Sequence, residues 1–307
     1  MNEELLSKLD SDGYCVVPNI LTSVSCDEYI TKIWDWLENL STGIDRNDKF
    51  TWNSKNWPPN IHGIIQQLRA GQEQFAWDIR CEPNVINIFE KIWNTDRLLV
   101  SSDAICIMKP PEICGTYKAT SWLHTDQAST KKGRHCIQGF VNLEETSEDD
   151  ACLLVYKGSH KYHEELFEQN GKTVKSDWYK LSEDDLDWIN TKNLELVRVA
   201  APKGSVVLWD SRTIHSNTPA KKNRPYQRFR YVIYVCMTPS EWCDAKNREK
   251  KIQAFNNFRV TSHWPHHIRL FPKNPQTFGK VLPDYNIRQE HAILSERGKQ
   301  LAGLINY

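Results

Sequence analysis

The chain has 307 residues, of which 39% are hydrophobic, and its 39 basic side chains balance 39 acidic ones. This composition is sufficient for a sizeable core, while zero net charge argues against a protein that holds nucleic acid through its overall field. Because there is no apolar run of about 18 residues and the N-terminus is acidic, we expect no membrane span and a cytoplasmic location.

The first hundred residues are predicted to be mainly helical. A capping box, Ser25-x-x-Glu28, marks the start of an amphipathic helix, and Pro83 opens another. Residues 45–60 are polar, contain tryptophan and end in prolines, which predicts an irregular loop of a size that often carries function. The expected elements are a helix at 1–12, a strand at 13–18, and helices at 25–40 and 83–94.

Beyond residue 100 the pattern changes to short apolar runs separated by turns and charged loops. These runs predict strands at 104–108, 136–143, 152–156, 194–200, 205–209 and 229–237. Helices followed by many strands indicate a mostly β fold with flanking α-helices, an antiparallel double sheet of the jelly-roll kind. Residues 167–193 interrupt the strands with charge and aromatic rings, and we interpret them as an excursion able to cover the mouth of a barrel.

The sequence contains no internal repeat, so a single domain spanning 1–307 is expected. Its three parts are a mainly helical N-terminal support at 1–100, a β-barrel core at 101–239 and a helical and loop-rich extension at 240–307.

The strongest chemical signal is the stretch Ser121-Trp122-Leu123-His124-Thr125-Asp126-Gln127. On a strand, residues two apart point to the same face, so His124 and Asp126 can reach one metal ion. A third ligand is available in His215, which follows the apolar run 206–209. Two histidines and one carboxylate form the facial triad of non-haem Fe(II) oxygenases, although an isolated His-x-Asp is more often a hydrogen-bonded surface pair.

An iron ion held by three side chains keeps positions for O₂ and a cosubstrate, and the cosubstrate needs an anchor of its own. For 2-oxoglutarate this anchor is a buried arginine that contacts the distal carboxylate through two hydrogen bonds. Arg228 and Arg230 open the strand after His215 and share a face if that strand is regular. Arg230 is favoured because it directly precedes the apolar core of the strand.

Four other places leave alternatives open. Gln138 either contacts 2-oxoglutarate or closes a polar network, and Lys109 either helps to hold a carboxylate or ends an edge strand before two prolines. Gly158-Ser159-His160 is expected to be a structural turn. The histidines at 263, 266 and 267 are expected to have a structural or interaction role, since Pro265 breaks any regular ligand geometry.

In this order, the motifs resemble those of the phytanoyl-CoA dioxygenase family of Fe(II)/2-oxoglutarate oxygenases. The resemblance covers most of residues 5–240 and rests on four blocks: Asp12-Gly13-Tyr14-Cys15-Val16-Val17-Pro18; Met108-Lys109-Pro110-Pro111 leading to Trp122-Leu123-His124-Thr125-Asp126-Gln127; Val141-Asn142-Leu143-Glu144-Glu145 with Gly158-Ser159-His160; and Lys203-Gly204-Ser205-Val206-Val207-Leu208-Trp209 with His215-Ser216-Asn217.

The resemblance implies a double-stranded β-helix, a cupin-like barrel, that holds iron through His124, Asp126 and His215. It also implies 2-oxoglutarate as cosubstrate, decarboxylated to succinate while O₂ is used to hydroxylate a C–H bond. The family's arginine stands about 11 residues after the distal histidine, whereas here the intervening loop is longer, so Arg228 and Arg230 compete for the role.

The expected substrate is a small or lipid-like molecule whose identity the sequence does not specify, and the oligomeric state is equally unspecified. A catalytically silent binding protein on the same scaffold, or a cupin-like isomerase, is the alternative. The intact set of His124, Asp126, His215 and an arginine favours the enzyme.

Overall fold

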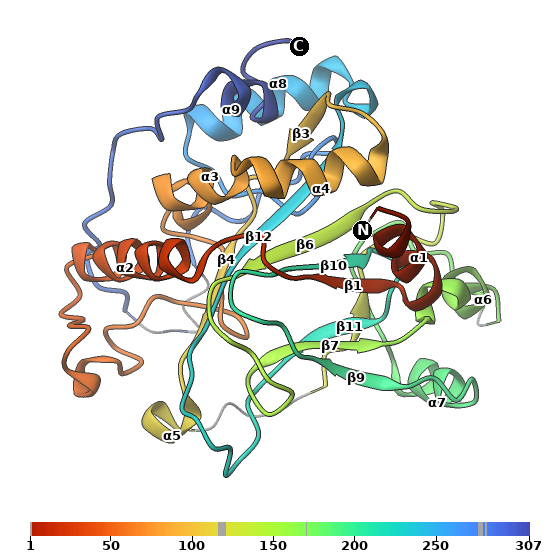
Figure 1. Ribbon diagram of the computed structural model, residues 1–307, viewed down its shortest axis with the longest axis horizontal. Coiled ribbons are helices and arrows are strands. Elements are labelled where there is room, and N and C mark those ends of the chain that lie inside the picture. Colours follow the sequence, from red (N-terminus) through yellow and green to blue (C-terminus); the bar gives the residue numbers. More distant parts are fainter. Residues whose placement is uncertain (1, 116–120, 170, 276–278, 280) are drawn as a thin grey trace.

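The computed structural model describes residues 2–115, 121–169, 171–275, 279 and 281–307, and it contains two antiparallel sheets with helices around them (Figure 1). The large sheet has the strand order β1 (Tyr14–Val17), β10 (Val206–Asp210), β6 (Ile137–Asn142), β12 (Arg230–Pro239), β4 (Ile105–Met108) and β2 (Ile64–Ile65), and β3 (Leu98–Val100) also pairs with β12. The small sheet has the order β8 (Tyr179–Lys180), β5 (His124–Thr125), β11 (His215–Thr218), β7 (Cys152–Tyr156) and β9 (Leu196–Val199).

The helices gather in three places. In Figure 1, α2, α3 and α4 lie along one side of the large sheet, α6 and α7 lie beside the end of the small sheet, and α8 and α9 lie near the C-terminus. Their bounds are α1 Asn2–Asp12, α2 Ser23–Asn39, α3 Gln74–Arg80, α4 Pro83–Trp93, α5 Pro111–Cys114, α6 His163–Glu168, α7 Glu183–Asn190, α8 Ala245–Asn256 and α9 Glu296–Leu301. No helix in the described part of the chain is both long and apolar enough to cross a membrane.

Two hydrophobic clusters hold these layers together. The first lies between the sheets and contains Phe140, Val155, Trp209 and Val232 from strands of both. The second packs the opposite face of the large sheet against α1–α4. Because side chains alternate along a strand, β1, β2, β4, β6, β10 and β12 each contribute to both clusters. One face of the large sheet is therefore turned toward the small sheet, and the other toward the helices.

The mostly β architecture with flanking helices is confirmed, and all six strands predicted beyond residue 100 are present. Three details differ from the expectation. The two sheets do not close into a barrel. Helix α2 begins at Ser23 rather than Ser25, because the hydroxyl of Thr22 accepts from the Ser25 N–H and caps the helix two residues earlier. Besides β1, which matches the strand predicted at 13–18, the first hundred residues supply two strands that were not predicted, β2 and β3, to the large sheet.

A buried arginine joins the helical layer to the sheet. Arg80, at the end of α3, is 0% exposed and donates to the backbone carbonyls of Gly71, Asp103 and Tyr234 at 2.6, 2.7 and 3.1 Å. Burial lowers the pKa of its guanidinium to about 10, so Arg80 stays protonated at neutral pH. It therefore fixes the segment before β4 against β12.

Replacing Arg80 with Met is expected to lower the free energy of unfolding by about 3 kcal/mol or more, because three buried carbonyls lose a charged donor. Urea unfolding followed by circular dichroism measures the change. Arg97→Met, at an exposed position, is the matched control and is expected to leave the unfolding midpoint in place. Equal midpoints for both variants and the wild type would show that Arg80 contributes nothing to stability.

Candidate metal centre

The structure brings His124, Asp126 and His215 together, although the third residue is far from the other two in the sequence. Strand β5 pairs with β11 so that His215 stands directly opposite His124, with 4.3 Å between the ring centres. Asp126 follows β5, and its N–H donates to the Ser211 carbonyl at 2.8 Å, which turns the chain back toward β11. One potential ligand atom from each of the three buried residues lies within 4.8 Å of the others.

The hydrogen bonds of the two imidazoles orient their Nε2 atoms toward the carboxylate. The Nδ1 atom of His124 lies 2.9 Å from the Trp122 carbonyl, and that of His215 lies 2.9 Å from the Thr213 carbonyl. A carbonyl only accepts, so Nδ1 carries the proton and Nε2 keeps its lone pair. The Oδ2 atom of Asp126 lies 3.5 Å from Nε2 of His124 and 3.3 Å from Nε2 of His215.

The protonation states also suit a divalent cation. Burial lowers the pKa of His215, as does the neighbouring His124 imidazole, which keeps His215 neutral. Burial alone raises the pKa of Asp126, but the imidazoles of His263 and His124 outweigh this effect, and the pKa ends well below its usual value. The neutral imidazole of His215 and the ionised carboxylate of Asp126 thus face one point, which Nε2 of His124 also approaches.

Two polar side chains of the large sheet contact the donor set. Gln138 donates from Nε2 to Oδ2 of Asp126 at 2.9 Å, a contact of the kind that the polar-network alternative expects. The indole N–H of Trp209 donates to Nε2 of His215 at 3.1 Å. A metal ion bound by His215 would take the place of this second hydrogen bond.

The two candidate arginines have different surroundings. Arg230 is 2% exposed in the inter-sheet layer, where its guanidinium lies 4.9 Å from the Phe140 ring centre and its Nη1 lies 3.4 Å from the Cys106 sulfur. Its Nη2 is buried and has no hydrogen-bond partner among the described residues. Arg228 lies before β12 rather than within it, and it pairs with Asp150 at 3.3 Å. The expectation that both arginines open the strand is therefore wrong.

Lys109 lies apart from this group. Its Nζ donates to the Trp52 carbonyl and lies 4.4 Å from the Trp57 ring centre. Lys109 follows β4, whose inward residues include Cys106, so alternation places it with the outward ones.

The motif at 158–160 forms the structural turn that was expected. Gly158 has φ +79°, a conformation that favours glycine, and the Ser159 hydroxyl accepts from the N–H of Ile214 at 2.8 Å. The turn thereby supports the residue before His215.

Sequence reasoning missed Asp103, a buried carboxyl group near the centre. Burial raises the pKa of the Asp103 carboxyl to about 6, and the His263 imidazole partly offsets this rise. The Thr261 N–H donates to the Ser102 carbonyl at 2.9 Å and so brings the two segments together. No spacing signal links residues this far apart in the sequence. Trp178, in the predicted excursion, has its ring centre 6.0 Å from that of His124.

Comparisons with known proteins show the family of the chain. Residues 9–224 match the family model described as phytanoyl-CoA dioxygenase (PhyH). Ava biosynthesis cluster protein O of Aspergillus versicolor is 30% identical over 263 residues, which cover 83% of each chain.

Two solved structures share the fold at low sequence identity. The epimerase SnoN from nogalamycin biosynthesis, in complex with Fe³⁺, α-ketoglutarate and nogalamycin RO, is 15% identical with a TM-score of 0.51, and the match covers 78% of this chain and 84% of that one. HygX from Streptomyces hygroscopicus, with nickel, 2-oxoglutarate and hygromycin B bound, is 14% identical with a TM-score of 0.50, and the match covers 78% and 88%.

Proposed function

The chain belongs to the phytanoyl-CoA dioxygenase family, and from this premise we propose that it is an Fe(II)- and 2-oxoglutarate-dependent oxygenase that hydroxylates a C–H bond of a small-molecule or lipid-like substrate. His124, Asp126 and His215 are the proposed iron ligands. The observation that carries the proposal is their convergence within 4.8 Å, with both histidines presenting an unprotonated Nε2.

The residues present fit both groups. Neutral imidazole and carboxylate are ligands that suit Fe(II), and three of them leave further positions open. Arg230 fits 2-oxoglutarate, because the buried Nη2 without a partner gains a charge-assisted hydrogen bond from a carboxylate. The ligands bound by SnoN and HygX favour the same cofactors.

When bound, iron and 2-oxoglutarate supply the oxidising chemistry, in which O₂ is consumed and 2-oxoglutarate is converted to succinate and CO₂. The side chains orient these groups. Gln138 fixes the Asp126 carboxylate, and the backbone carbonyls of Trp122 and Thr213 fix the two imidazole rings. The three proposed ligands are each less than 8% exposed, which limits access of bulk water.

The test is an aerobic assay with Fe(II), 2-oxoglutarate and a panel of metabolites and acyl compounds, with succinate and product mass as readouts. We expect succinate formation that is stimulated by one class of compound, together with a product heavier by one oxygen atom. If the iron-loaded protein forms no succinate, either with any of the compounds or without them, the result would favour the catalytically silent binding protein. A product with unchanged or lower mass, formed with succinate, would retain the oxygenase but reject hydroxylation.

The excursion at 167–193 covers this centre only in part. Leu181 and Ile189 are buried and pack with Leu123 and Ile214, so they belong to the core. Trp178 is 48% exposed and faces His124, and the neighbouring Asp177 pairs with Lys131 at 2.7 Å. Residue 170 of the predicted lid lies outside the described part of the chain. The covering role therefore rests on the stretch around Trp178.

Replacing Trp178 with Ala is expected to raise succinate formation in the absence of substrate by about threefold or more, because water gains access to the centre. Succinate is measured with and without the stimulating compound. Trp242→Ala removes another exposed tryptophan, 39% exposed, and is expected to behave as wild type. Identical substrate-free rates in all three proteins would remove the covering role.

A further inference from the structure

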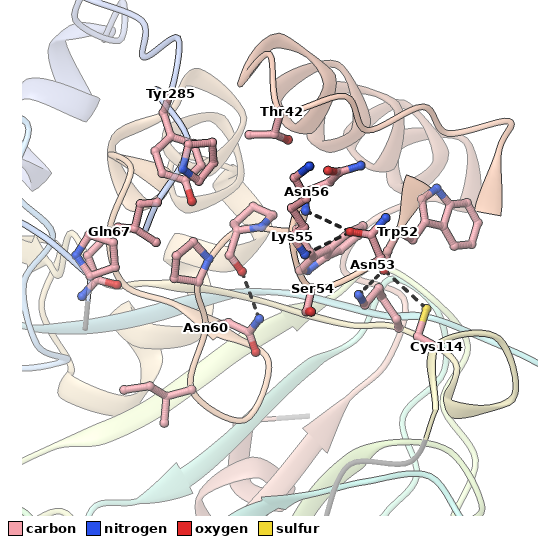
Figure 2. A pocket seen from close by; sticks show the side chains of 18 of the residues that line it. Thr42, Trp52, Asn53, Ser54, Lys55, Asn56, Asn60, Gln67, Cys114 and Tyr285 are labelled. Carbon is pink, nitrogen blue, oxygen red and sulfur yellow. Dashed lines mark hydrogen bonds between the residues drawn. The ribbon is translucent and has the colours of Figure 1, made fainter. Parts of the chain in front are cut away.

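A cavity of about 1290 Å³ lies on the helix-facing side of the large sheet. It is bounded mainly by residues 42–61, 109–115, 272–275 and 281–285, and Figure 2 shows Tyr285 on a different side of it from Trp52 and Cys114. Its volume exceeds the range of about 300–1000 Å³ that is typical of small-molecule sites, so it has room for a ligand of that size. Walls from four segments make it a pocket for a small molecule rather than a flat docking face.

The large sheet separates this cavity from the metal centre. None of His124, Asp126, His215 and Arg230 lines it. Cys106 and Met108 of β4 pack in the inter-sheet layer, whereas Ile105 and Ile107 pack on the helix side with Trp57. Lys109 continues the second set and lines the cavity. The two sites thus lie on opposite faces of one sheet.

The charged side chains that line the cavity in the described part of the chain are all positive. Lys49, Lys55 and Lys109 line it, and the described lining residues include no aspartate or glutamate. Lys109 is only 8% exposed, and its Nζ contacts the Trp52 carbonyl and the Trp57 ring, which are both neutral. Burial lowers the pKa of its ammonium group. A buried cation without a counter-charge is costly, so a bound anion would stabilise it.

The walls also contain unpaired hydrogen-bonding groups. The Trp57 indole nitrogen and the Thr42 hydroxyl are buried and have no hydrogen-bond partner within the described residues. An indole N–H only donates, as does an ammonium group, so the wall favours an acceptor-rich ligand. Aromatic and proline side chains, including Phe50 and Tyr285, supply apolar surface for the remainder of the molecule.

We propose that this cavity is a second small-molecule site, which binds an organic acid with an aromatic or aliphatic body and holds its carboxylate at Lys109. The apolar body packs against the tryptophan and proline walls. The site is independent of the proposed oxygenase activity, because it shares no lining residue with the metal centre.

Isothermal titration of the full-length protein with 2-naphthoate, and with the neutral 2-naphthamide as its counterpart, tests the proposal. The wild type is expected to bind one equivalent of the acid at least about tenfold more tightly than the amide, the difference that one charge-assisted hydrogen bond supplies. Lys109→Met is expected to lose this preference while Lys109→Arg keeps it. Lys32→Met, at an exposed position on α2, is the matched control and is expected to bind as wild type.

A competition arm separates the cavity from the anion site at Arg230. Excess 2-oxoglutarate with Fe(II) under anaerobic conditions is expected to leave naphthoate binding unchanged. Displacement of the acid by 2-oxoglutarate would place the acid at the metal centre and overturn the proposal. Equal affinities for acid and amide would also overturn it, and so would a lack of binding of the acid at millimolar concentration. If Lys109→Met does not fold, two other measurements test the proposal. They are the preference of the wild type and of Lys109→Arg for the acid over the amide, and the competition with 2-oxoglutarate.

Discussion

Asp126→Ala is expected to bind Fe(II) at least about 100-fold more weakly than the wild type and to form no succinate from 2-oxoglutarate, because two neutral imidazoles remain to balance a dication. Asp126 is the charged member of the donor set, and its Oδ2 lies 3.5 Å or less from both imidazoles. Metal content after dialysis against Fe(II) under anaerobic conditions measures the first effect. Succinate formation measures the second.

The control for this variant removes a carboxylate elsewhere. The side chain of Asp149 is 47% exposed and forms an ion pair with Lys221 at 2.8 Å, so Asp149→Ala is expected to keep wild-type iron content and turnover. Circular dichroism checks that both variants are folded. A folded Asp126→Ala protein with one bound iron and full turnover would reject the three-residue ligand set.

Arg230→Lys is expected to raise the Michaelis constant for 2-oxoglutarate by about tenfold or more, since lysine lacks the planar fork that contacts both carboxylate oxygens. Arg230 is buried beside Phe140, and its Nη2 has no partner among the described residues. An amino group on a flexible stem recovers the charge but not the paired geometry. Initial rates of succinate formation at varied 2-oxoglutarate measure the constant.

Arg228→Lys is the matched control, because it makes the same change two residues away. Arg228 already has partners: Asp150 at 3.3 Å and the Tyr226 ring, whose centre lies 4.3 Å from its guanidinium carbon. We expect its Michaelis constant to stay within about twofold of wild type, because lysine keeps the charge that pairs with Asp150 and this pair does not involve 2-oxoglutarate. The opposite outcome, with Arg228→Lys impaired and Arg230→Lys normal, would assign the carboxylate to Arg228.

Local patterns in the sequence predicted the elements that are long or strongly punctuated. Strand β7 lies at 152–156 as expected, and α4 begins at Pro83 and ends before Asn94, whose φ of 52° suits a helix end. Strands β2 and β3 have two and three residues, which is too short for a periodic signal. Strand β8 lies in a charged segment, and it forms because β5 offers it an edge.

The convergence of the three candidate ligands was predicted in part because His124 and Asp126 share a local stretch. Strand β5 ends at Thr125, so the regular strand assumed for both residues covers only the first, yet the turn after it keeps the two side chains together. The cross-strand partnership of His124 and His215 depends on long-range register, which residue spacing does not encode.

Lys109 lies on the other face of the large sheet from Arg230. The alternation of Ile105, Cys106, Ile107 and Met108 leads to this placement, which disfavours the alternative that Lys109 holds the same carboxylate as Arg230. By contrast, the approach of the segment around His263 to Asp103 arises from the path of the C-terminal extension, and no motif marks it.

Anaerobic titration of the wild-type protein with Fe(II) and 2-oxoglutarate, followed by visible absorption, tests the central assignment most directly. Iron held by His124, Asp126 and His215 with open positions is expected to give a charge-transfer band only when both additions are present, saturating at one iron per chain and absent in Asp126→Ala. Iron that binds elsewhere without a band, or a band of equal intensity in Asp126→Ala, would contradict the account.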